Sequence, residues 1–341
     1  MSEPLLDLQH VSRTFRIGGL ILGTPLVAVD DVSLRVPAGR PMILSIVGES
    51  GSGKTTLARM ILRLVAPTGG RVLLRGQDVT RLSGHRQLLA YRRTVQPVFQ
   101  NPFESFSAHR TVDCYLFETA QGLRIARTRN EARSVVARAV ASVGMTLEGV
   151  AGKYPHQFSG GELQRISVAR ALIPGPALLV ADEPVGMIDA SLRMNIVNAF
   201  VDLKQDVGVS IIYITHDLST ASYISDAVAI MFRGTIVEYG PAAAVLESPR
   251  HPYTQLLLES VPRIGAKWDD EVPAAGEERR EYELSGCRFA DRCPHVTPEC
   301  RAERPADLAL PDGRRVACIH HERIFGPVPH ADELHRLERS D

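Results

Sequence analysis

Short apolar runs alternate with segments of helical spacing along most of this chain. Residues Leu5 to Phe15 alternate polar and apolar positions, as a half-buried strand does, and Val27 to Val36 resembles its returning partner. Continuous apolar runs follow at Met42–Val47, Ala177–Ala181 and Val209–Thr215. Each of these runs is the length of a strand that is buried on both faces. Buried strands separated by helices predict an α/β fold, with a mostly parallel sheet between layers of helices.

Four stretches have helical character. Apolar residues recur at helical spacing in Leu163–Leu172 and Ser191–Gln205, and Ser159 is positioned to cap the first of these two helices. Thr111 to Met145 has few strand signals and predicts a helical insertion, and Pro241 to Leu258 predicts a short helical segment. The charged stretch Lys267 to Glu283 contains Pro273 and Gly276, which predicts a linker or surface loop.

A glycine-rich loop lies between the buried run Met42–Val47 and an apolar helical stretch. It fits the pattern G-x-x-x-x-G-K-[ST], and its residues are Gly48, Glu49, Ser50, Gly51, Ser52, Gly53, Lys54, Thr55 and Thr56. Strand, glycine loop and helix in this order form the context of a phosphate-binding loop, in which backbone N–H groups converge on phosphate oxygens. Lys54 would reach the β- and γ-phosphates, and the Thr55 hydroxyl would bind Mg²⁺. The sequence therefore predicts binding of a nucleoside triphosphate.

Polar residues follow the other predicted strands. Asp182 comes after the run Ala177–Ala181, where a carboxylate can hold Mg²⁺, and Glu183 could polarise a water for attack on the γ-phosphate. His216 follows another buried strand, at the edge where open α/β sheets bind ligands. Gln100 ends the short apolar run Val95–Phe99. A lone histidine or glutamine at such a position is a weak signal.

Composition narrows the class of protein. The 341 residues carry no formal net charge, are 44% hydrophobic and 23% charged, and so predict about two ordinary domains without an electrostatic signature for nucleic acid. Neither a membrane-spanning run nor a signal pattern is present, which predicts a cytosolic chain whose membrane role depends on a partner. Four of the five cysteines follow residue 286, and a reduced cytosol disfavours disulfides between them. The fifth, Cys114, is expected to be a small buried apolar residue.

With these motifs in place, residues 5–262 resemble the ATP-binding subunit of an ABC transporter. Phe158-Ser159-Gly160-Gly161-Glu162 followed by Leu163-Gln164-Arg165 resembles the family's signature motif, in which glutamine usually stands where this chain has Glu162. Gly186-Met187-Ile188-Asp189 resembles the D-loop, although the family usually has Ser-Ala-Leu in place of the first three residues. Glu162 places an acid near a phosphate site and could weaken ATP-driven closure.

The resemblance implies a role for each matched residue. Gln100 corresponds to the Q-loop glutamine, which senses Mg²⁺ and the membrane partner, and Phe15 to the aromatic residue that stacks on adenine. Asp182 corresponds to the Walker B aspartate, Glu183 to the catalytic glutamate and His216 to the switch histidine. The implied Mg²⁺ ligands are Thr55, Gln100 and Asp182, and the implied catalytic residues are Glu183, His216 and Lys54. Since all of them are present, an active ATPase is expected.

The resemblance also implies an assembly. Two ATP molecules would be buried between two such subunits, identical or homologous, with Ser159 to Glu162 and Asp189 of each completing the partner's site. Two transmembrane permease subunits and an extracytoplasmic solute-binding protein would complete an importer, and this chain would lie on the cytoplasmic face of the inner membrane. The expected fold is a P-loop ABC ATPase domain at 1–262, with a RecA-like mixed sheet, an antiparallel β subdomain and a helical subdomain at about 101–172. A C-terminal region would follow at 263–341.

The spacing of Cys287, Cys293, Cys300 and Cys318 fits neither common zinc modules nor ferredoxins, and indicates only a metal or unpaired thiols. His251-Pro252-Tyr253-Thr254 and the residues around Cys287 and Cys293 resemble the C-terminal region of the oligopeptide/dipeptide branch of ABC importers. In that branch four such cysteines can ligate a [4Fe–4S] cluster. Zinc, or thiols without a metal, are the alternatives.

The leading hypothesis is thus an ATPase that powers peptide import. Import of an oligosaccharide, nickel or glutathione by the same machinery is the alternative, because the binding protein and permease select the solute. A soluble ABC ATPase that acts on nucleic acid or ribosomes is a second class, although such proteins typically carry two ATPase modules or a long coiled-coil or zinc insertion. A regulatory protein that binds ATP without hydrolysing it is the third.

Overall fold

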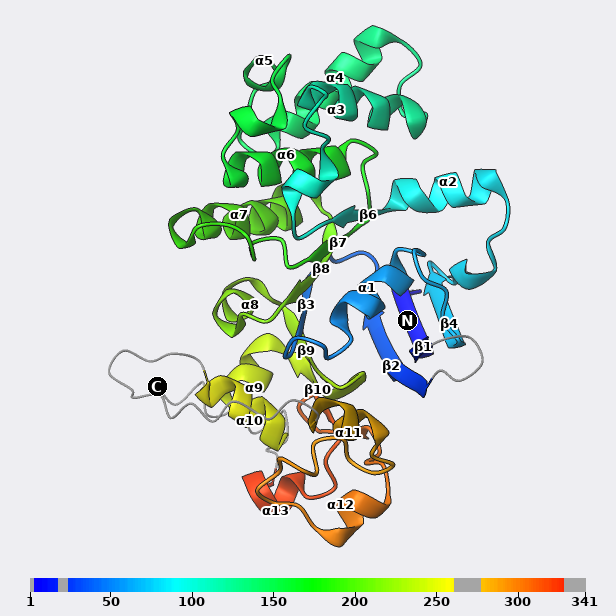
Figure 1. The fold of residues 1–341 in the computed structure, drawn as a ribbon, viewed down its shortest axis with the longest axis vertical. Helices are drawn as coiled ribbons and strands as arrows, with labels where there is room; N and C mark the ends of the chain where they lie inside the picture. The colour runs from blue at the N-terminus through cyan, green and yellow to red at the C-terminus, as the bar shows by residue number, and fades with distance from the viewer. Residues whose placement is uncertain (1–2, 18–23, 261–276, 328–341) are drawn as a thin grey trace.

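The computed structural model describes residues 3–17, 24–260 and 277–327, which form two sheets with their helices (Figure 1). The larger sheet has eight strands in the order β11-β12-β10-β9-β3-β8-β7-β6. Its members are β3 (Ile43–Val47), β6 (Val95–Val98), β7 (Leu178–Asp182), β8 (Ser210–Thr215), β9 (Ala227–Phe232), β10 (Thr235–Pro241), β11 (Leu308–Ala309) and β12 (Arg315–Val316). The five strands from β9 to β6 are parallel, which confirms the predicted mixed α/β sheet.

The smaller sheet is antiparallel and has the order β2-β1-β4-β5. It consists of β1 (Leu6–Ile17), β2 (Thr24–Val36), β4 (Gly69–Leu74) and β5 (Gln77–Asp78). Alternate residues of β2 are buried along its second half, as the alternating polar and apolar pattern predicts. Residues 18–23, between β1 and β2, lie outside the described residues.

Each buried strand of the larger sheet contributes side chains to two separate hydrophobic cores, because successive side chains point to opposite faces of the sheet. Leu178 and Val180 of β7 pack into a core with α1 (Lys54–Ile61) and the antiparallel sheet. Leu179 and Ala181 pack into a second core with the helices on the other face. A strand that is apolar at every position is therefore required here, and this explains the continuous apolar runs in the sequence.

The second core is built mainly from helices between β6 and β8. They are α3 (Val112–Gly122), α4 (Arg129–Ala141), α5 (Leu147–Val150), α6 (Gly160–Leu172) and α7 (Ala190–Asp202), and a π-helical turn, Leu203–Val207, ends α7. Figure 1 shows α3 to α6 gathered at one end of the molecule, beyond the edge strand β6. Cys114 on α3 is only half-buried, and its thiol lies 3.1 Å from the Thr111 hydroxyl, so the expectation of a buried residue is wrong.

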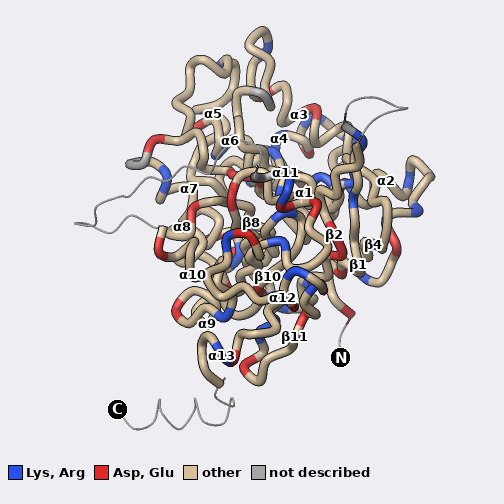
Figure 2. Tube along the Cα trace, turned by 60° about the horizontal axis from the view of Figure 1, so that its bottom comes forward, with Lys and Arg blue, Asp and Glu red and all other residues tan. Residues whose placement is uncertain are grey.

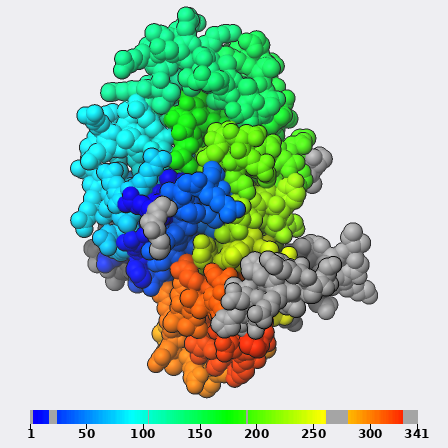
Figure 3. Space-filling view, turned by 180° about the vertical axis from the view of Figure 1, so that it is seen from behind, coloured from blue at the N-terminus to red at the C-terminus, as the bar shows by residue number. Residues whose placement is uncertain are grey.

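The described C-terminal residues pack against the core that the two sheets form. Helix α11 (Glu277–Glu283) is followed by α12 (Pro298–Ala302), the two short strands β11 and β12, and α13 (His321–Phe325). β12 pairs antiparallel with β10 and so extends the larger sheet. Residues 277–283 are helical, which corrects the prediction of a linker there, since Glu281 is buried in an ion pair with Arg233 (2.7 Å). The space-filling view shows this orange and red lobe below the blue N-terminal part and the yellow-green part of the chain (Figure 3).

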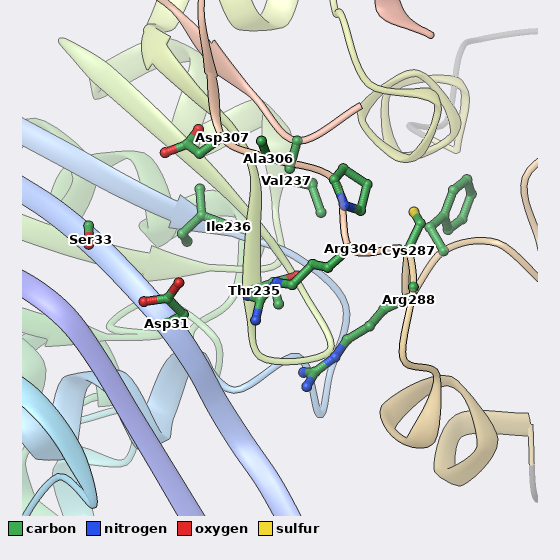
Figure 4. Close-up of a pocket in the computed structure, with 14 residues that line it drawn as sticks. Asp31, Ser33, Thr235, Ile236, Val237, Cys287, Arg288, Arg304, Ala306 and Asp307 are labelled. Atoms are coloured by element: carbon green, nitrogen blue, oxygen red, sulfur yellow. The ribbon is translucent and has the colours of Figure 1, made fainter. Parts of the chain in front are cut away.

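Charged pairs join the lobe to the antiparallel sheet. Arg288 and Arg304 both contact the Asp30 carboxylate of β2, at 2.7 Å and 3.0 Å, and Arg315 donates to the Ser33 carbonyl oxygen of β2 at 2.9 Å. Within the lobe, Arg315 also pairs with Asp307 at 2.9 Å. These residues surround or adjoin a cavity of about 300 Å³ between β2, the β9–β10 hairpin and the lobe (Figure 4). Because its basic and acidic side chains satisfy one another, the cavity belongs to the joint between the two parts of the chain.

An aromatic cluster fills the other side of the same joint. Phe289 of the lobe is 1% exposed and packs against Phe232 of β9 and Tyr253 of α10 (Pro252–Glu259), with ring centroids 5.4 Å away in both cases. The short helices α8 (Leu218–Ile224) and α9 (Ala242–Glu247) contribute to this third core. Among the described residues, no helix is both long enough and apolar enough to cross a bilayer.

Replacement of Phe289 by alanine tests whether the lobe is an integral part of the fold. We expect Phe289→Ala to lower the free energy of unfolding by about 3–5 kcal/mol, because it leaves a cavity among buried rings. The matched control is Phe103→Ala, whose ring is 50% exposed, with an expected change within about 0.5 kcal/mol. Urea denaturation of the full chain measures both. Equal effects would show that the lobe does not contribute to the stability of the core.

Candidate functional site

The carboxyl ends of four adjacent parallel strands, β3, β8, β7 and β6, meet at one edge of the larger sheet. The glycine loop follows β3, His216 follows β8, Asp182 ends β7 and Gln100 comes two residues after the end of β6. The chain order of these residues differs from their spatial order, since β7 and β8 come after the helical insertion. The topology thus brings together side chains that are more than a hundred residues apart.

The glycine loop has the tight geometry that backbone N–H convergence requires. Gly53 precedes α1 with φ of 103°, and a Cβ atom there would lie 2.3 Å from the Ala28 carbonyl oxygen. At Gly48 a Cβ atom would lie 2.1 Å from the Met231 carbonyl oxygen. Neither position has space for a side chain, and Gly53 also needs the left-handed conformation that glycine adopts without strain. The loop is therefore specified by sterics as well as by its ligand.

Lys54 lies inside this loop and is almost completely buried. Its ammonium group donates to the carbonyl oxygens of Gly48 (2.7 Å) and Glu49 (2.8 Å) and to the Ser52 hydroxyl (3.3 Å). Burial lowers the pKa of Lys54, and the neighbouring carboxylates of Glu183, Asp182 and Glu49 oppose that shift. Because neutral oxygens hold the Lys54 ammonium, it can exchange these hydrogen bonds for stronger ones to phosphate oxygens.

Thr55 and Asp182 provide oxygen atoms for a divalent cation. The Thr55 hydroxyl donates to the Asp182 carboxylate at 3.3 Å. Burial raises the pKa of Asp182, and the hydrogen bond from Thr55 and the charge of Lys54 act in the opposite direction. Hydroxyl and carboxylate oxygens suit Mg²⁺, which takes few protein ligands and completes its shell with water and phosphate oxygens. These two side chains fit such a cation, and it would neutralise charge on the transferring phosphoryl group.

Glu183 accepts two hydrogen-bond contacts that fix its carboxylate. Gln100 Nε2 donates to Oε2 at 3.1 Å, and His216 Nδ1 lies 3.1 Å from Oε1. The residue has a positive φ of 45°, and its N–H donates to the Ile214 carbonyl of β8 at 2.9 Å. Non-glycine residues adopt this conformation rarely, and it is often found where a side chain is held for function. The arrangement suits a carboxylate that orients and deprotonates a water.

Gly186 lies next to this carboxylate. A Cβ atom at position 186 would lie 3.4 Å from Gln100 Nε2, from the Glu183 carbonyl oxygen and from Glu183 Oε2. These are ordinary van der Waals distances, so packing does not exclude the serine that is usual at this D-loop position. Asp189, the last residue of the same motif, is the N-cap of α7.

The signature residues lie at the start of α6, in the helical layer (Figure 1). Ser159 and Glu162 form a capping box, in which the Ser159 hydroxyl and N–H both donate to Glu162 Oε2 at 2.8 Å. These hydrogen bonds lower the pKa of Glu162 and keep it charged. Glu162 therefore has a local structural role, which residue pattern alone did not reveal. The predicted N-cap at Ser159 is confirmed.

Phe15 stands apart from the residues at the strand ends. It lies on β1, opposite Leu26 of β2, and its half-buried ring has the Arg13 guanidinium 4.5 Å from its centroid. The neighbouring residues 18–23 lie outside the described part of the chain. Stacking of adenine on Phe15 stays a prediction.

A groove of about 990 Å³ begins at this site and extends between α2 (His85–Thr94), α3 and α6. Thr55, Gln100 and Asp182 lie at one end of it. Its lining includes three exposed apolar side chains, Leu64 (59%), Phe99 (43%) and Met187 (62%). Exposed apolar residues of this size beside a functional site are typical of a docking surface for another protein. Sequence reasoning did not identify this groove, because its residues come from six separate segments.

The four C-terminal cysteines line one small cavity of about 20 Å³, beside His251 and Phe289. Burial raises the pKa of Cys287 to about 12 and of Cys318 to about 11, so both thiols are protonated in these surroundings. Within the described ranges, no three histidine, cysteine, aspartate or glutamate side chains are arranged to hold a metal ion. The topology gathers the cysteines, but the predicted [4Fe–4S] cluster and the alternative zinc ion gain no support from their geometry.

Known proteins share both parts of this architecture. The family profile "ABC transporter" matches residues 29–186, and "Oligopeptide/dipeptide transporter, C-terminal region" matches residues 237–300. "Probable peptide ABC transporter ATP-binding protein y4tS" of Sinorhizobium fredii is 40% identical over 335 residues, which cover 97% of this chain and 93% of that protein. The di/tripeptide transport ATP-binding protein DppF of Pseudomonas aeruginosa is 38% identical over 335 residues, 95% of this chain and 100% of that protein.

The fold is also that of solved ATP-binding cassettes. The dimeric post-hydrolysis structure of the cassette MJ0796, bound to ADP and Pi, superposes with a TM-score of 0.60. It is 24% identical in sequence and covers 70% of this chain and 98% of its own. The chain belongs to the family of ABC transporter ATP-binding proteins, in the branch with the oligopeptide/dipeptide C-terminal region. It is thus an ATPase of the ABC type.

One substitution at Glu183 separates ATP hydrolysis from ATP binding. We expect Glu183→Gln to lower ATP turnover by about 10²–10⁴-fold, because an amide cannot accept the proton of the attacking water. Its affinity for MgATP should stay within about threefold of wild type, since phosphate contacts dominate binding. Phosphate release and calorimetric titration measure the two quantities. The matched control is Glu247→Gln, an exposed acid on α9. Turnover that survives in Glu183→Gln would remove Glu183 from the catalytic role.

Proposed function

We propose that this chain is the ATP-hydrolysing subunit of an importer that takes up di- and oligopeptides across the cytoplasmic membrane. One observation carries the proposal. A phosphate loop, a candidate magnesium site and a fixed carboxylate converge on one sheet edge, in a chain whose C-terminal residues match the oligopeptide/dipeptide transporter region. The relatives y4tS and DppF support the choice of peptides, because their names assign them to peptide and di/tripeptide transport.

The proposed chemistry is transfer of the γ-phosphoryl group of ATP to water. Lys54 and the backbone N–H groups of the glycine loop bind and orient the phosphates. Glu183 accepts the proton of the attacking water, and His216 faces the γ-phosphate and holds Glu183 in place. Gln100 links this carboxylate to the groove beyond β6. Thr55 and Asp182 would hold Mg²⁺ and Gln100 would sense it, and the ion would supply positive charge to balance the charge that develops on the phosphoryl oxygens.

A second ATP-binding subunit completes the site in this proposal. The residues at the sheet edge would contact one face of the nucleotide, and Ser159 to Glu162 lie elsewhere, at the start of α6. The same residues of a facing subunit, together with its Asp189, would cover the other face. ATP binding would close the pair, and hydrolysis would open it, because separated phosphate products repel each other. The pair contains either two identical subunits or two homologous ones.

The groove beside Gln100 is the proposed docking surface for a permease. The groove is lined both by residues of the proposed nucleotide site and by residues of α3 and α6. A permease helix bound in it would therefore move with the helical layer. Two transmembrane permease subunits would place this chain on the cytoplasmic face of the inner membrane. An extracytoplasmic binding protein would deliver the solute. Since the permease and binding protein select the solute, an oligosaccharide, nickel or glutathione is the alternative cargo.

Co-purification from membranes tests this assembly. A tagged chain should recover a hydrophobic subunit from detergent-solubilised membranes, and Phe99→Asp should lower that recovery by about tenfold or more, because it places a charge in an apolar docking surface. Tyr223→Asp is the matched control, since Tyr223 is 60% exposed on α8 and outside the groove. Quantitative mass spectrometry of the eluates provides the measurement. Recovery of ribosomes or nucleic acid without a hydrophobic subunit would contradict the importer proposal.

We further propose a [4Fe–4S] cluster as the occupant of the four-cysteine cavity. Four thiols that line one cavity are the donor set of such a cluster, and its iron ions would hold them as thiolates. Phe289, packed beside them, would limit access of water. The arrangement of the side chains does not itself define the site, so the proposal depends on the donor set.

Anaerobic purification decides between the occupants. The cluster predicts about four iron and four sulfide per chain with a brown colour, which Cys300→Ser should remove. Cys114→Ser should retain them, because Cys114 lies on α3 in the helical layer. A colourless protein, with zinc or without metal, would exclude the cluster.

A further inference from the structure

The C-terminal lobe contacts the phosphate loop itself. The Arg292 guanidinium forms two parallel bonds with the Glu49 carboxylate, Nη1 to Oε2 at 2.9 Å and Nη2 to Oε1 at 2.8 Å. The Tyr282 hydroxyl of α11 donates to the Gly51 carbonyl oxygen. The Glu49 N–H donates to the Tyr253 hydroxyl at 3.0 Å. In the view of Figure 2, α11 overlies the region of α1, and basic (blue) and acidic (red) residues lie along this part of the chain. Glu49 and Gly51 of the phosphate loop are thus held by residues that follow the ATP-binding motifs in the sequence.

The surroundings of Arg292 hold its guanidinium in one orientation. The group lies 5.6 Å from the ring centroids of both Phe232 and Phe289, and Glu281 Oε1 lies 3.9 Å away. Arg292 is 22% exposed and Glu49 is 30% exposed, so solvent screens the pair only partly. A planar fork that is packed between rings loses little freedom when it binds a carboxylate. The pair is therefore preorganised.

Glu49 creates an electrostatic problem that this contact solves. Its side chain adds a negative charge to a loop that must bind a triphosphate, and its own carbonyl oxygen holds Lys54 at 2.8 Å. An uncompensated carboxylate at this position would repel the phosphates and attract the lysine that they need. With Arg292 bound in a bidentate pair, the charge of Glu49 is neutralised and its carboxylate is held by the guanidinium.

We propose that Arg292 is a positioning residue for ATP binding: it neutralises and holds Glu49, so that the C-terminal lobe sets the affinity of the phosphate loop for the triphosphate. Arg292 acts through Glu49 and does not contact the nucleotide. The inference rests on the proposed role of residues 48–56 as the phosphate site. It makes the lobe a part of the ATP site, with Tyr282 and Tyr253 as secondary supports.

A set of variants with paired charges tests this role in the full chain. The dissociation constant of MgATP is measured by calorimetric titration for wild type, Arg292→Gln, Glu49→Gln and the double variant. Loss of the arginine alone should weaken ATP binding by about fivefold, the effect expected for one partly screened charge pair. The double variant should return to within about twofold of Glu49→Gln, because no carboxylate then remains to be neutralised.

Controls separate this effect from a loss of folding. Arg304→Gln removes another arginine of the same joint, one that pairs with Asp30, and should leave ATP affinity unchanged. Thermal unfolding reports whether each variant is folded. If Arg292→Gln does not fold, Arg292→Lys replaces it, since lysine keeps the charge without the fork. Its affinity should lie below wild type and rise again when Glu49→Gln is added.

Two results would overturn the inference. One is wild-type affinity in a folded Arg292→Gln variant, or in Arg292→Lys if that variant is used. The other is a double variant that binds ATP as weakly as the single arginine variant, because the arginine would then act independently of Glu49. Failure of the wild-type chain to bind ATP would instead refute the proposed function.

Discussion

The architecture depends on one constraint, the parallel alignment of β3, β8, β7 and β6. Parallel strands end at the same edge, and each strand here is buried on both faces by a different core. Neither face can therefore carry the polar chemistry, and the functional side chains are placed where the strands end. Asp182, Glu183 and His216 follow directly from this arrangement, and the tight turn at Gly48 brings the loop to the same edge.

The site at that edge satisfies its own charges. Lys54 is held by carbonyl oxygens, Asp182 by the Thr55 hydroxyl, and Glu183 by Gln100 and His216. A site of this kind can exchange internal partners for phosphate and Mg²⁺ at small cost in reorganisation. The signature residues are separate from it, in a capping box at the start of α6. In the proposed mechanism one chain contributes two separate half-sites, and for this reason that mechanism requires a pair of subunits.

Sequence patterns predicted the part of the fold that depends on local rules. Apolar runs gave the buried strands, the glycine loop and its flanks gave the phosphate-loop context, and Ser159 gave a helix cap. The joint between core and lobe could not be predicted in this way. Residues 277–283 are mostly charged and adjoin Pro273 and Gly276, and the ion pair between buried Glu281 and the distant Arg233 explains why this helix is anchored to the core. Arg292 and Glu49 are 243 positions apart, and no local pattern indicates that they pair. The groove beside Gln100 could not be predicted either, because its lining residues come from segments that are separate in the sequence.

The central claim, that ATP hydrolysis at this sheet edge drives peptide import, is tested most directly by transport in sealed vesicles. The chain and its permease partners would be reconstituted so that the chain lies on the inner side of the vesicle membrane. ATP would be enclosed in the vesicle, and labelled dipeptide and the binding protein would be added outside. The account predicts that peptide accumulates only when ATP is supplied, and that accumulation stops when a non-hydrolysable ATP analogue replaces ATP. It also predicts that phosphate is released faster when peptide is present. Peptide accumulation at the same rate without hydrolysable ATP, or phosphate release that never responds to peptide, would contradict it.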